Sequence, residues 1–181
     1  MKKICKTLPN TGMRPEGSLG IEDIISLLNP ESTMVEVGCY YGESTLMWES
    51  SDKIIKIFAV DPWKDFYDPN DGASQKGNMN EVESLFDENI KDSSKIIKMK
   101  MTSKEASEKF EENSLDFVYL DGSHAYQDLK DDINNWLPKI KKSGFIGGHD
   151  IGWQTVQNAI KDTLGGINQQ FGDSSWIVKV Q

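Results

Sequence analysis

The chain has 181 residues, a length that one domain can use to bury a hydrophobic core without disulfides or metals. Its 29 acidic residues outnumber its 20 lysines and arginines, which gives a formal net charge of -9 at pH 7. This excess of negative charge argues against nucleic acid as a partner, because phosphate groups would be repelled over most of the surface.

Two cysteines, Cys5 and Cys39, are too few for a disulfide framework, so we expect reduced thiols in a cytoplasmic protein. The N-terminal residues are positively charged but lack the long apolar run of a signal peptide or a membrane span. We therefore expect no membrane attachment. We also expect a single domain over residues 1–181, in which residues 1–30 form an N-terminal segment and a helix.

Strands and helices alternate along the predicted chain. Short runs rich in Val, Ile, Phe and Met predict strands at residues 32–39, 54–60, 95–101, 115–120 and 144–147, with a closing strand at 175–180. Helices are predicted at residues 21–28, 43–50, 80–90, 103–110, 126–140 and 155–164. Such alternation predicts an α/β fold with a parallel sheet covered by helices on both faces.

Residues 62–78 interrupt this alternation with a long polar loop that contains Pro, Gly, Asn and three aromatic residues. Loops of this length inside a domain are usually lids, binding loops or disordered segments. Two alternatives stay open for this loop. It is either a lid that closes over a substrate or a disordered segment.

The first strand ends in VEVGCYYGEST, where Gly38 and Gly42 flank a turn that opens onto a helix. Ligands of such sheets bind beyond the carboxyl ends of the strands, and glycines let the backbone approach them closely. Glu36 and Glu43 bring negative charge to the place where a dinucleotide's pyrophosphate would sit. Tyr40 and Glu43 also replace two glycines of the dinucleotide pattern. The turn therefore favours a cofactor that carries an ammonium and a sulfonium.

The second strand ends in FAVDPW, which places Asp61 about twenty residues beyond the glycine turn. An acid at this position holds the ribose hydroxyls of adenosine cofactors. The alternative is an aspartate that merely forms the turn before Pro62, and position alone leaves both open. After the third strand, Thr102 and Glu105 have the spacing of a helix capping box.

Four motifs follow in order along the chain: Glu36-x-Gly38-x-x-x-Gly42, Asp61-Pro62-Trp63, Leu120-Asp121-Gly122-Ser123-His124-x-Tyr126 and Gly147-Gly148-His149-Asp150. Over residues 31–161 this order resembles the class I S-adenosylmethionine-dependent methyltransferases. Within them it is most similar to the branch of macrocin-type sugar O-methyltransferases and cephalosporin-hydroxylase-like proteins. The resemblance implies a three-layer Rossmann-like methyltransferase fold, whose mostly parallel sheet has about seven strands and an antiparallel C-terminal strand.

The resemblance also implies how the cofactor would bind. Gly38 and Gly42 would line the methionine part of S-adenosylmethionine, and Glu36 would position its amino group directly or through water. Asp61 would take the ribose hydroxyls. Ser103, in the turn after the third strand, would lie near the adenine, although the capping box explains that turn without any ligand.

For the acceptor side, the resemblance implies that Asp121 and Asp150 project over the cofactor's methyl group and share Mg2+ or Mn2+. His149 stands where the family has an acid, and a metal that tolerates imidazole would use it as a ligand. His124 matches the family's general base, with Asp121 as the second catalytic residue. The alternative for His124 is a residue that ends a turn and caps the following helix.

The implied activity is O-methylation of a small hydroxylated acceptor such as a sugar or a glycoside. Two functions of other classes stay open. One is a NAD-dependent Rossmann oxidoreductase, against which the missing glycines and Glu43 argue. The other is a non-catalytic domain that binds S-adenosylmethionine or another small molecule.

Overall fold

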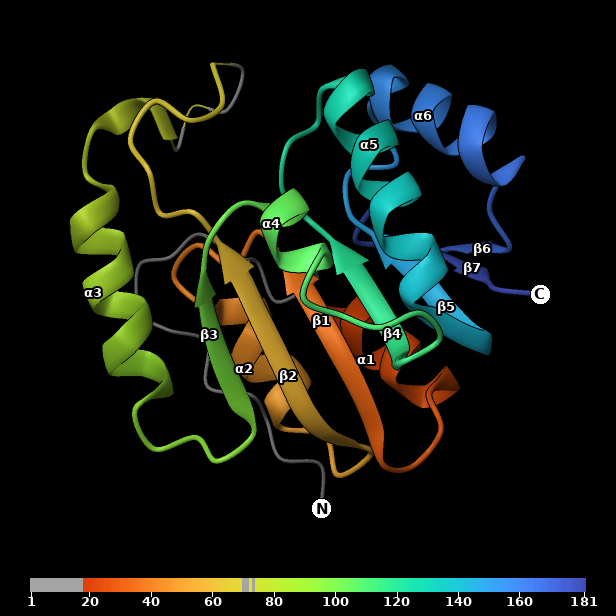
Figure 1. Ribbon diagram of the computed structural model, residues 1–181, viewed down its shortest axis with the longest axis horizontal. Coiled ribbons are helices and arrows are strands. Elements are labelled where there is room, and N and C mark those ends of the chain that lie inside the picture. The colour runs from red at the N-terminus through yellow and green to blue at the C-terminus, as the bar shows by residue number, and fades with distance from the viewer. Residues whose placement is uncertain (1–17, 70–71, 73) are drawn as a thin grey trace.

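The computed structural model describes residues 18–69, 72 and 74–181. Figure 1 shows its central sheet, which runs in the order β3-β2-β1-β4-β5-β7-β6. The strands are β1 (Ser32–Val37), β2 (Ile54–Asp61), β3 (Ile96–Lys100), β4 (Leu115–Leu120), β5 (Ile140–Gly148), β6 (Gln169–Gln170) and β7 (Trp176–Lys179). The first five pair in parallel, whereas β7 is antiparallel to both β5 and β6. The predicted fold class, a mostly parallel sheet with an antiparallel C-terminal strand, is confirmed.

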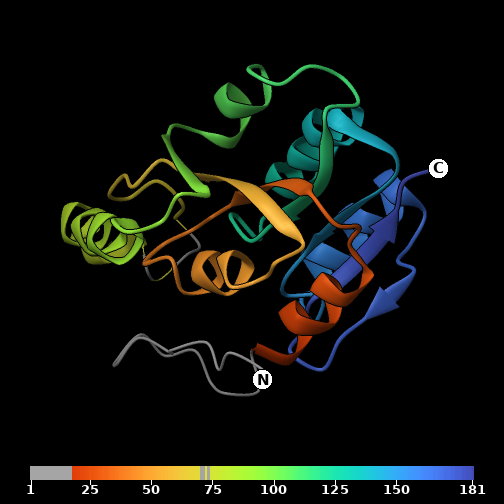
Figure 2. The ribbon, with the colours of Figure 1, turned by 90° about the horizontal axis from the view of Figure 1, so that it is seen from below.

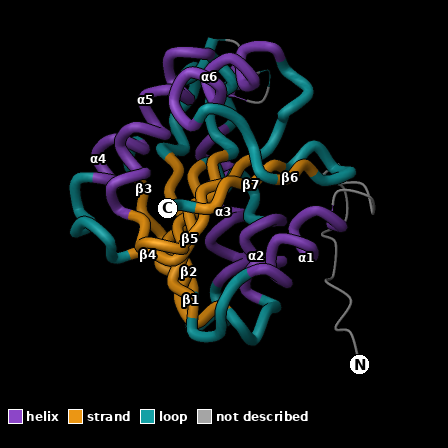
Figure 3. Tube along the Cα trace, turned by 90° about the vertical axis from the view of Figure 1, so that its right-hand side faces the viewer, coloured by secondary structure: helices purple, strands orange, loops and turns teal. Residues whose placement is uncertain are grey.

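Helices cover both faces of the sheet, which gives three layers (Figure 3). The helices α1 (Ser18–Leu27), α2 (Glu43–Glu49) and α3 (Met79–Ile90) lie on one side, and α4 (Ser103–Ser107), α5 (Tyr126–Trp136) and α6 (Gln154–Leu164) lie on the other. Figure 2 shows the same arrangement from below, with α1 and α2 beneath the sheet. Within the described residues, no helix combines the length and the apolar character that crossing a bilayer requires.

A hydrophobic core lies between the sheet and each helical layer. On the α5 side, Leu129, Ile133 and Trp136 recur at helical spacing and are buried against strand residues such as Val35 and Val118. On the other side, residues of α1 and α2 pack on the opposite face of the same strands. Because the centre of the sheet is buried on both sides, the central strands β1 and β4 are nearly continuous apolar runs.

Most elements differ from their predicted bounds by up to three residues, as in α4, which ends at Ser107 rather than at residue 110, and the short strand β6 was not predicted. Two elements differ more. The helix predicted at residues 126–140 ends at Trp136 and continues as a 3-10 turn (Leu137–Lys139), because Pro138 cannot supply a helical N–H. Strand β5 begins at Ile140 rather than at residue 144. Its first half contains two lysines and a serine, all exposed. A prediction based on apolar runs therefore misses this part of the strand.

The loop over residues 62–78 contains local structure, including a 3-10 turn (Ser74–Lys76). The Phe66 N–H donates to the Ser74 carbonyl oxygen at 2.9 Å, and the Ser74 hydroxyl donates to the Asp68 carbonyl oxygen at 2.7 Å. Residues 70, 71 and 73 lie outside the described residues. The described part of the loop is therefore held by its own hydrogen bonds.

Candidate functional site

A cavity of about 610 Å³ lies at the carboxyl ends of the parallel strands. Its walls come from the turns that follow β1, β2, β3 and β4, and from the polar face of α5. Five residues of the 62–78 loop, Tyr67 and Asp68 among them, also line it. A volume of this size is typical of small-molecule sites, which measure about 300–1,000 Å³. The cavity thus lies at the edge of the sheet where the sequence predicts a ligand.

The turn after β1 requires two glycines, and we call residues 38–42 the glycine turn. Gly38 has φ of 86°, and a Cβ atom on it would lie 2.1 Å from the Asp121 carbonyl oxygen. Gly42 has φ of 88°, and its Cβ would lie 2.9 Å from the Phe86 ring. Tyr40, in place of the middle glycine, also adopts a left-handed conformation with φ of 47°. The turn therefore keeps its shape without that glycine, at the cost of backbone strain at Tyr40.

Glu36 lies beneath the glycine turn with no solvent exposure, and it is not among the residues that line the cavity. Its Oε2 accepts a hydrogen bond from the Thr45 hydroxyl, and its Oε1 accepts one from Trp48 Nε1 at 3.0 Å. Burial raises the pKa of Glu36 to about 7, against hydrogen bonds from Ser44, Thr45 and Trp48 that lower it. Glu36 thus ties β1 to α2, and any contact with a cofactor would have to pass through neighbouring groups or water.

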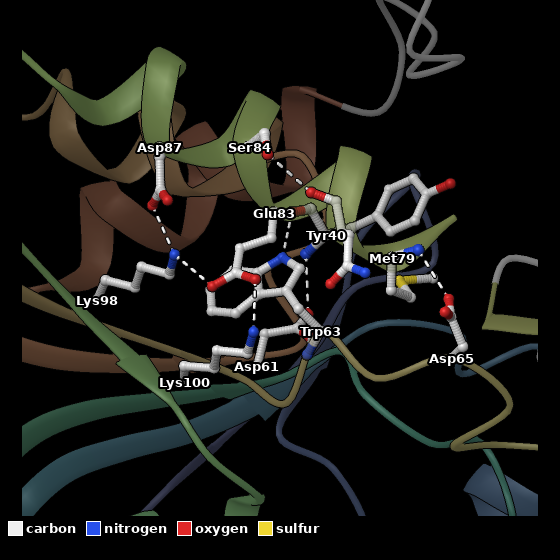
Figure 4. Close-up of polar contacts among 11 residues, drawn as sticks. Tyr40, Asp61, Trp63, Asp65, Met79, Glu83, Ser84, Asp87, Lys98 and Lys100 are labelled. Atoms are coloured by element: carbon white, nitrogen blue, oxygen red, sulfur yellow. Dashed lines mark hydrogen bonds and ion pairs between the residues drawn. The ribbon is translucent and has the colours of Figure 1, made fainter. Parts of the chain in front are cut away.

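Asp61 joins the end of β2 to the glycine turn (Figure 4). Its Oδ2 accepts backbone N–H groups of Cys39 and Tyr40, each at 3.0 Å, and its Oδ1 accepts the Trp63 N–H at 2.7 Å. The turn contact expected of an aspartate before Pro62 is therefore present. Asp61 also lines the cavity, and ribose binding by its carboxylate stays a prediction.

Trp63 anchors this part of the site from below. Its side chain is 2% exposed, and its Nε1 donates to the Tyr40 carbonyl oxygen at 3.0 Å. One face packs against Phe86, with ring centroids 4.7 Å apart, and Lys98 Nζ lies 4.9 Å from the ring centroid. Figure 4 shows that the Lys98 ammonium group also forms ion pairs with Glu83 and Asp87. The glycine turn is thereby fixed to α3 and β3.

The turn after β3 is closed by its own side chains. Thr102 and Glu105 form the predicted capping box, in which the Thr102 hydroxyl donates to Glu105 Oε2 at 2.7 Å. The neighbouring Ser103 hydroxyl accepts a hydrogen bond from Trp136 Nε1 at 2.8 Å. Both hydroxyls line the cavity, yet each is already used within the protein.

Asp132, on the polar face of α5, lines the cavity opposite this turn. Burial raises the pKa of its carboxyl to about 6, while a hydrogen bond from Ser103 lowers it and the charges of Asp128 and Asp131 add to the rise. No motif pointed to this residue. Only the apolar stripe of the helix was visible in the sequence, and a charged residue on the other face is typical of a solvated helix.

Two aspartates and two histidines meet beyond β4 and β5, and we call Asp121, His124, His149 and Asp150 the histidine cluster. His124 Nε2 lies 2.6 Å from Asp150 Oδ2, and His149 Nδ1 lies 3.2 Å from the same oxygen. His149 Nδ1 also lies 4.0 Å from Asp121 Oδ1. The structure thus brings together every residue predicted for the base and for the metal.

The charges of the histidine cluster shift one another's titration. Burial opposes ionisation of Asp150, but hydrogen bonds from His124 and His149 outweigh it and hold the pKa of Asp150 well below its ordinary range. Burial likewise disfavours the charged form of His149, but its bond to Asp150 and the charge of Asp121 raise its pKa to about 9. Burial raises the pKa of Asp121 to about 6, against the charge of His149. Such displaced values are typical of sites that handle protons.

Asp121, His124 and Asp150 each offer one ligand atom, and these atoms lie within 4.8 Å of one another. The sequence predicted His149 rather than His124 as the third ligand beside the two aspartates. Carboxylates suit Mg2+ and Mn2+, and an imidazole among them favours Mn2+ or another transition metal over Mg2+. The donor set therefore fits a divalent cation that tolerates imidazole, and metal binding itself stays a prediction.

Trp153 stands beside the cluster at the start of α6. Its ring centroid lies 5.2 Å from that of His124 with 30° between the planes, and the residue is 52% exposed. Its N–H donates to the Asp150 carbonyl oxygen at 2.9 Å, which fixes the short turn between β5 and α6. In the sequence, Gly152-Trp153 follows closely after Asp150, so its place near the site could have been noticed. A single tryptophan, however, predicts no particular role.

A family model described as a methyltransferase domain matches residues 35–151, more than half of the chain. Among curated proteins, the uncharacterised protein y4gI of Sinorhizobium fredii is 28% identical over 146 residues, which are 78% of this chain. Those residues make up 15% of that relative, so the chain spans only a small part of its length.

Solved structures share the fold at low sequence identity. The precorrin 8w decarboxylase of Methanobacterium thermoautotrophicum is 19% identical with a TM-score of 0.59, and the match covers 88% of this chain and 83% of that one. Geranyl diphosphate C-methyltransferase of Streptomyces coelicolor, in complex with Mg2+, geranyl-S-thiolodiphosphate and S-adenosyl-L-homocysteine, is 14% identical with a TM-score of 0.52. That match covers 72% of this chain and 41% of the other. These likenesses show a Rossmann-like methyltransferase fold.

Proposed function

Since this chain belongs to the family of methyltransferase domains, we propose that it transfers the methyl group of S-adenosylmethionine to a hydroxyl group of a small acceptor. A sugar or a glycoside is the acceptor class that the macrocin-type resemblance of its motifs favours. The observation that carries the proposal is the histidine cluster, which places an imidazole and two carboxylates beside a cavity bordered by the glycine turn.

The cofactor would lie along the strand ends. Its sulfonium and ammonium would face the glycine turn and Asp121, where carboxylates suit a cation. Its ribose would lie at Asp61, because an acid at the end of the second strand is placed to accept ribose hydroxyl donors. Glu36, buried below, would support the amino end of the cofactor indirectly by fixing β1 against α2.

Methyl transfer would proceed by displacement in one step. The acceptor oxygen attacks the methyl carbon, the new C–O bond forms as the C–S bond breaks, and the bonding electron pair leaves with sulfur to give S-adenosylhomocysteine. His124 takes the hydroxyl proton. With Nε2 engaged by Asp150 at 2.6 Å, that proton would go to Nδ1, and the Asp150 carboxylate would stabilise the imidazolium that forms. Trp153 would restrict the tilt of the His124 ring.

In an alternative, metal-assisted form of the reaction, Asp121, His124 and Asp150 would hold a divalent cation, Mn2+ being the best match to their donor atoms, and His124 would then serve as a ligand instead of the base. When bound, such a cation would polarise the acceptor hydroxyl and lower its pKa. The S. coelicolor relative binds Mg2+, which makes metal assistance a reasonable proposal for this chain. Dialysis against a chelator, followed by assays with added Mg2+ or Mn2+, separates a metal-dependent reaction from one that needs His124 alone.

Calorimetric titration with S-adenosylhomocysteine and with NADH tests the cofactor assignment. We expect S-adenosylhomocysteine to bind and NADH not to bind, because Glu43 lines the cavity where a pyrophosphate would sit. Binding of NADH alone would overturn the proposal in favour of an oxidoreductase. Transfer of a radiolabelled methyl group to a panel of sugars and glycosides then tests the activity. Cofactor binding without transfer to any acceptor, with or without metal, would favour a non-catalytic binding domain.

A further inference from the structure

The five tryptophans of the chain fall into two groups. Four of them are at most 2% exposed and donate their indole N–H to a protein oxygen: Trp48, Trp63, Trp136 and Trp176. Trp153 is 52% exposed, and among the described residues no group accepts a hydrogen bond from its indole N–H. A tryptophan usually finds a partner for this N–H when the fold buries it. The ring and the N–H of Trp153 are therefore open to a ligand.

The position of Trp153 matters more than its exposure, because single exposed apolar side chains are common on protein surfaces. Trp153 directly precedes α6, and its ring centroid lies 5.2 Å from that of His124, the proposed base. The His124 ring covers only part of the indole, since about half of the residue stays exposed. His124 lines the cavity and Trp153 does not. The indole therefore extends the site beyond the cavity, next to the base.

The backbone around Trp153 is fixed by hydrogen bonds. The Trp153 N–H donates to the Asp150 carbonyl oxygen at 2.9 Å, and the Trp153 carbonyl oxygen accepts the Gln157 N–H at 3.0 Å. The Gln157 side chain closes the same turn, because its Nε2 donates to the Ile151 carbonyl oxygen at 2.8 Å. A surface that is already ordered loses little conformational freedom when a ligand binds to it. Trp153 thus has the rigidity that a binding residue needs.

The chemistry around the indole suits a sugar in its ring form. The face of an aromatic ring is electrically negative, so it attracts the weakly positive hydrogens of C–H groups. A pyranose ring presents C–H groups on its faces and hydroxyl groups around its edge. The carboxylates of Asp121 and Asp150 in the histidine cluster can accept hydrogen bonds from such hydroxyls. A phenol would also stack on the indole, but most of its edge carries no hydroxyl to donate.

We propose that Trp153 binds the acceptor by stacking its exposed indole surface on the C–H face of a pyranose ring, while one hydroxyl of that ring reaches His124. This inference rests on the proposed function and names the residue that selects the ring form of the sugar. The indole N–H donates to an oxygen of the same acceptor. An acyclic polyol carries similar hydroxyls but has no rigid C–H face, so the protein should distinguish the two.

Methyl transfer to the methyl pyranosides of glucose, galactose and rhamnose, and to the acyclic alditols of the same sugars, tests this assignment. In the wild-type protein, kcat/KM for the best pyranoside should exceed that for its alditol by about tenfold or more. Trp153→Ala should raise KM for that pyranoside by about tenfold to a hundredfold and reduce the preference to within about threefold. Trp153→Phe, which keeps an aromatic face, should retain most of the preference. Affinity for S-adenosylhomocysteine should change by less than about threefold in both variants.

Leu85→Ala is the matched control, because it removes an apolar side chain that is 50% exposed on α3 and does not line the cavity. It should leave KM and the preference unchanged. If Trp153→Ala lowers kcat for pyranosides and alditols alike and keeps the preference, Trp153 only orients His124 and the proposal is overturned.

Two results with the wild-type protein also overturn the role of Trp153 in sugar binding while leaving methyl transfer intact. One is equal use of pyranosides and alditols, and the other is a higher kcat/KM for catechol than for every pyranoside. Absence of transfer to any acceptor would instead overturn the proposed function and this inference with it.

Discussion

At the glycine turn the Asp61 carboxylate accepts three backbone N–H groups, whereas at the histidine cluster the Asp150 carboxylate is held by two imidazole rings. Backbone donors do not titrate, so the first arrangement is a fixed scaffold. Imidazoles titrate near neutral pH, so the second can exchange protons with a substrate. The carboxylates that follow β2 and β5 thus differ in their chemistry because of what donates to them.

This contrast implies that substitutions in the two regions should affect different properties of the protein, turnover in one and stability in the other. In the histidine cluster a lost side chain should reduce turnover while the fold survives, because all four side chains are partly exposed. Around the glycine turn a lost or added atom should reduce stability first, since the backbone there is strained and packed. The predictions below test this division, beginning with the largest expected effect.

His124→Ala should lower kcat for methyl transfer by about 100-fold to 10,000-fold, the usual contribution of a general base. Affinity for S-adenosylhomocysteine should change by less than about threefold, and the urea unfolding midpoint should hardly move. Gln127→Ala is the control, because this exposed residue lies nearby at the start of α5 and its side chain donates a hydrogen bond to Asp131. Full activity of His124→Ala on every accepted substrate would show that another group takes the proton.

Gly38→Ala should lower the free energy of unfolding by about 4 kcal/mol, the sum of left-handed strain and overpacking. The added Cβ would meet the Asp121 carbonyl oxygen at 2.1 Å, and this backbone atom cannot swing aside. Gly165→Ala is the matched control, because Gly165 has φ of 75° but open space around it. It should cost only about 1 kcal/mol. If urea unfolding shows that both variants lose the same free energy of unfolding, the close approach of residue 38 to Asp121 does not contribute to the cost of the Gly38→Ala substitution.

Glu36→Gln should change the pH dependence of stability. Folding raises the pKa of Glu36 from 4.5 to about 7, so its stabilising contribution is complete below about pH 4.5 and is lost as pH rises through about 7. A shift of this size corresponds to about 3 kcal/mol. The wild-type protein should therefore lose about that much stability relative to the variant between pH 4.5 and pH 8, measured by urea unfolding. If the difference in unfolding free energy between the wild-type protein and Glu36→Gln does not vary with pH, the burial of this carboxyl is contradicted. Glu112→Gln, at an exposed position, is the control and should show no such variation.

The periodicity of apolar residues and the residues at the strand ends predicted much of the fold and part of the site. The apolar stripe of α5 and the order of the strands follow from local pattern, and so does the capping box at Thr102. The choice of hydrogen-bond partners does not follow from local pattern. The Cys39 N–H donates to Asp61 at the end of the neighbouring strand, and Trp136 Nε1 donates to Ser103 on another helix, contacts that no local spacing encodes.

The same limit explains why the two histidines were read differently in the sequence and lie together in the structure. His124 sits in a motif of one strand end and His149 in that of the next, so their roles were inferred separately. Register between β4 and β5 then sets Leu120 beside Gly148 and brings both imidazoles to one Asp150 oxygen. Strand pairing, rather than residue type, decides which histidine can complete a metal site.

Thr102→Ala should have the smallest effect, and it separates a structural role for the turn after β3 from a direct contact with the cofactor. Removing the capping hydroxyl should cost about 1 kcal/mol of unfolding free energy. Affinity for S-adenosylhomocysteine should stay within about threefold, because the hydroxyl already donates to Glu105. Thr163→Ala, which removes a hydroxyl bonded within α6 to the Ala159 carbonyl oxygen, should cost less. A tenfold loss of affinity in Thr102→Ala without a loss of stability would place this residue among the cofactor contacts, and the turn would then belong with the histidine cluster rather than with the scaffold.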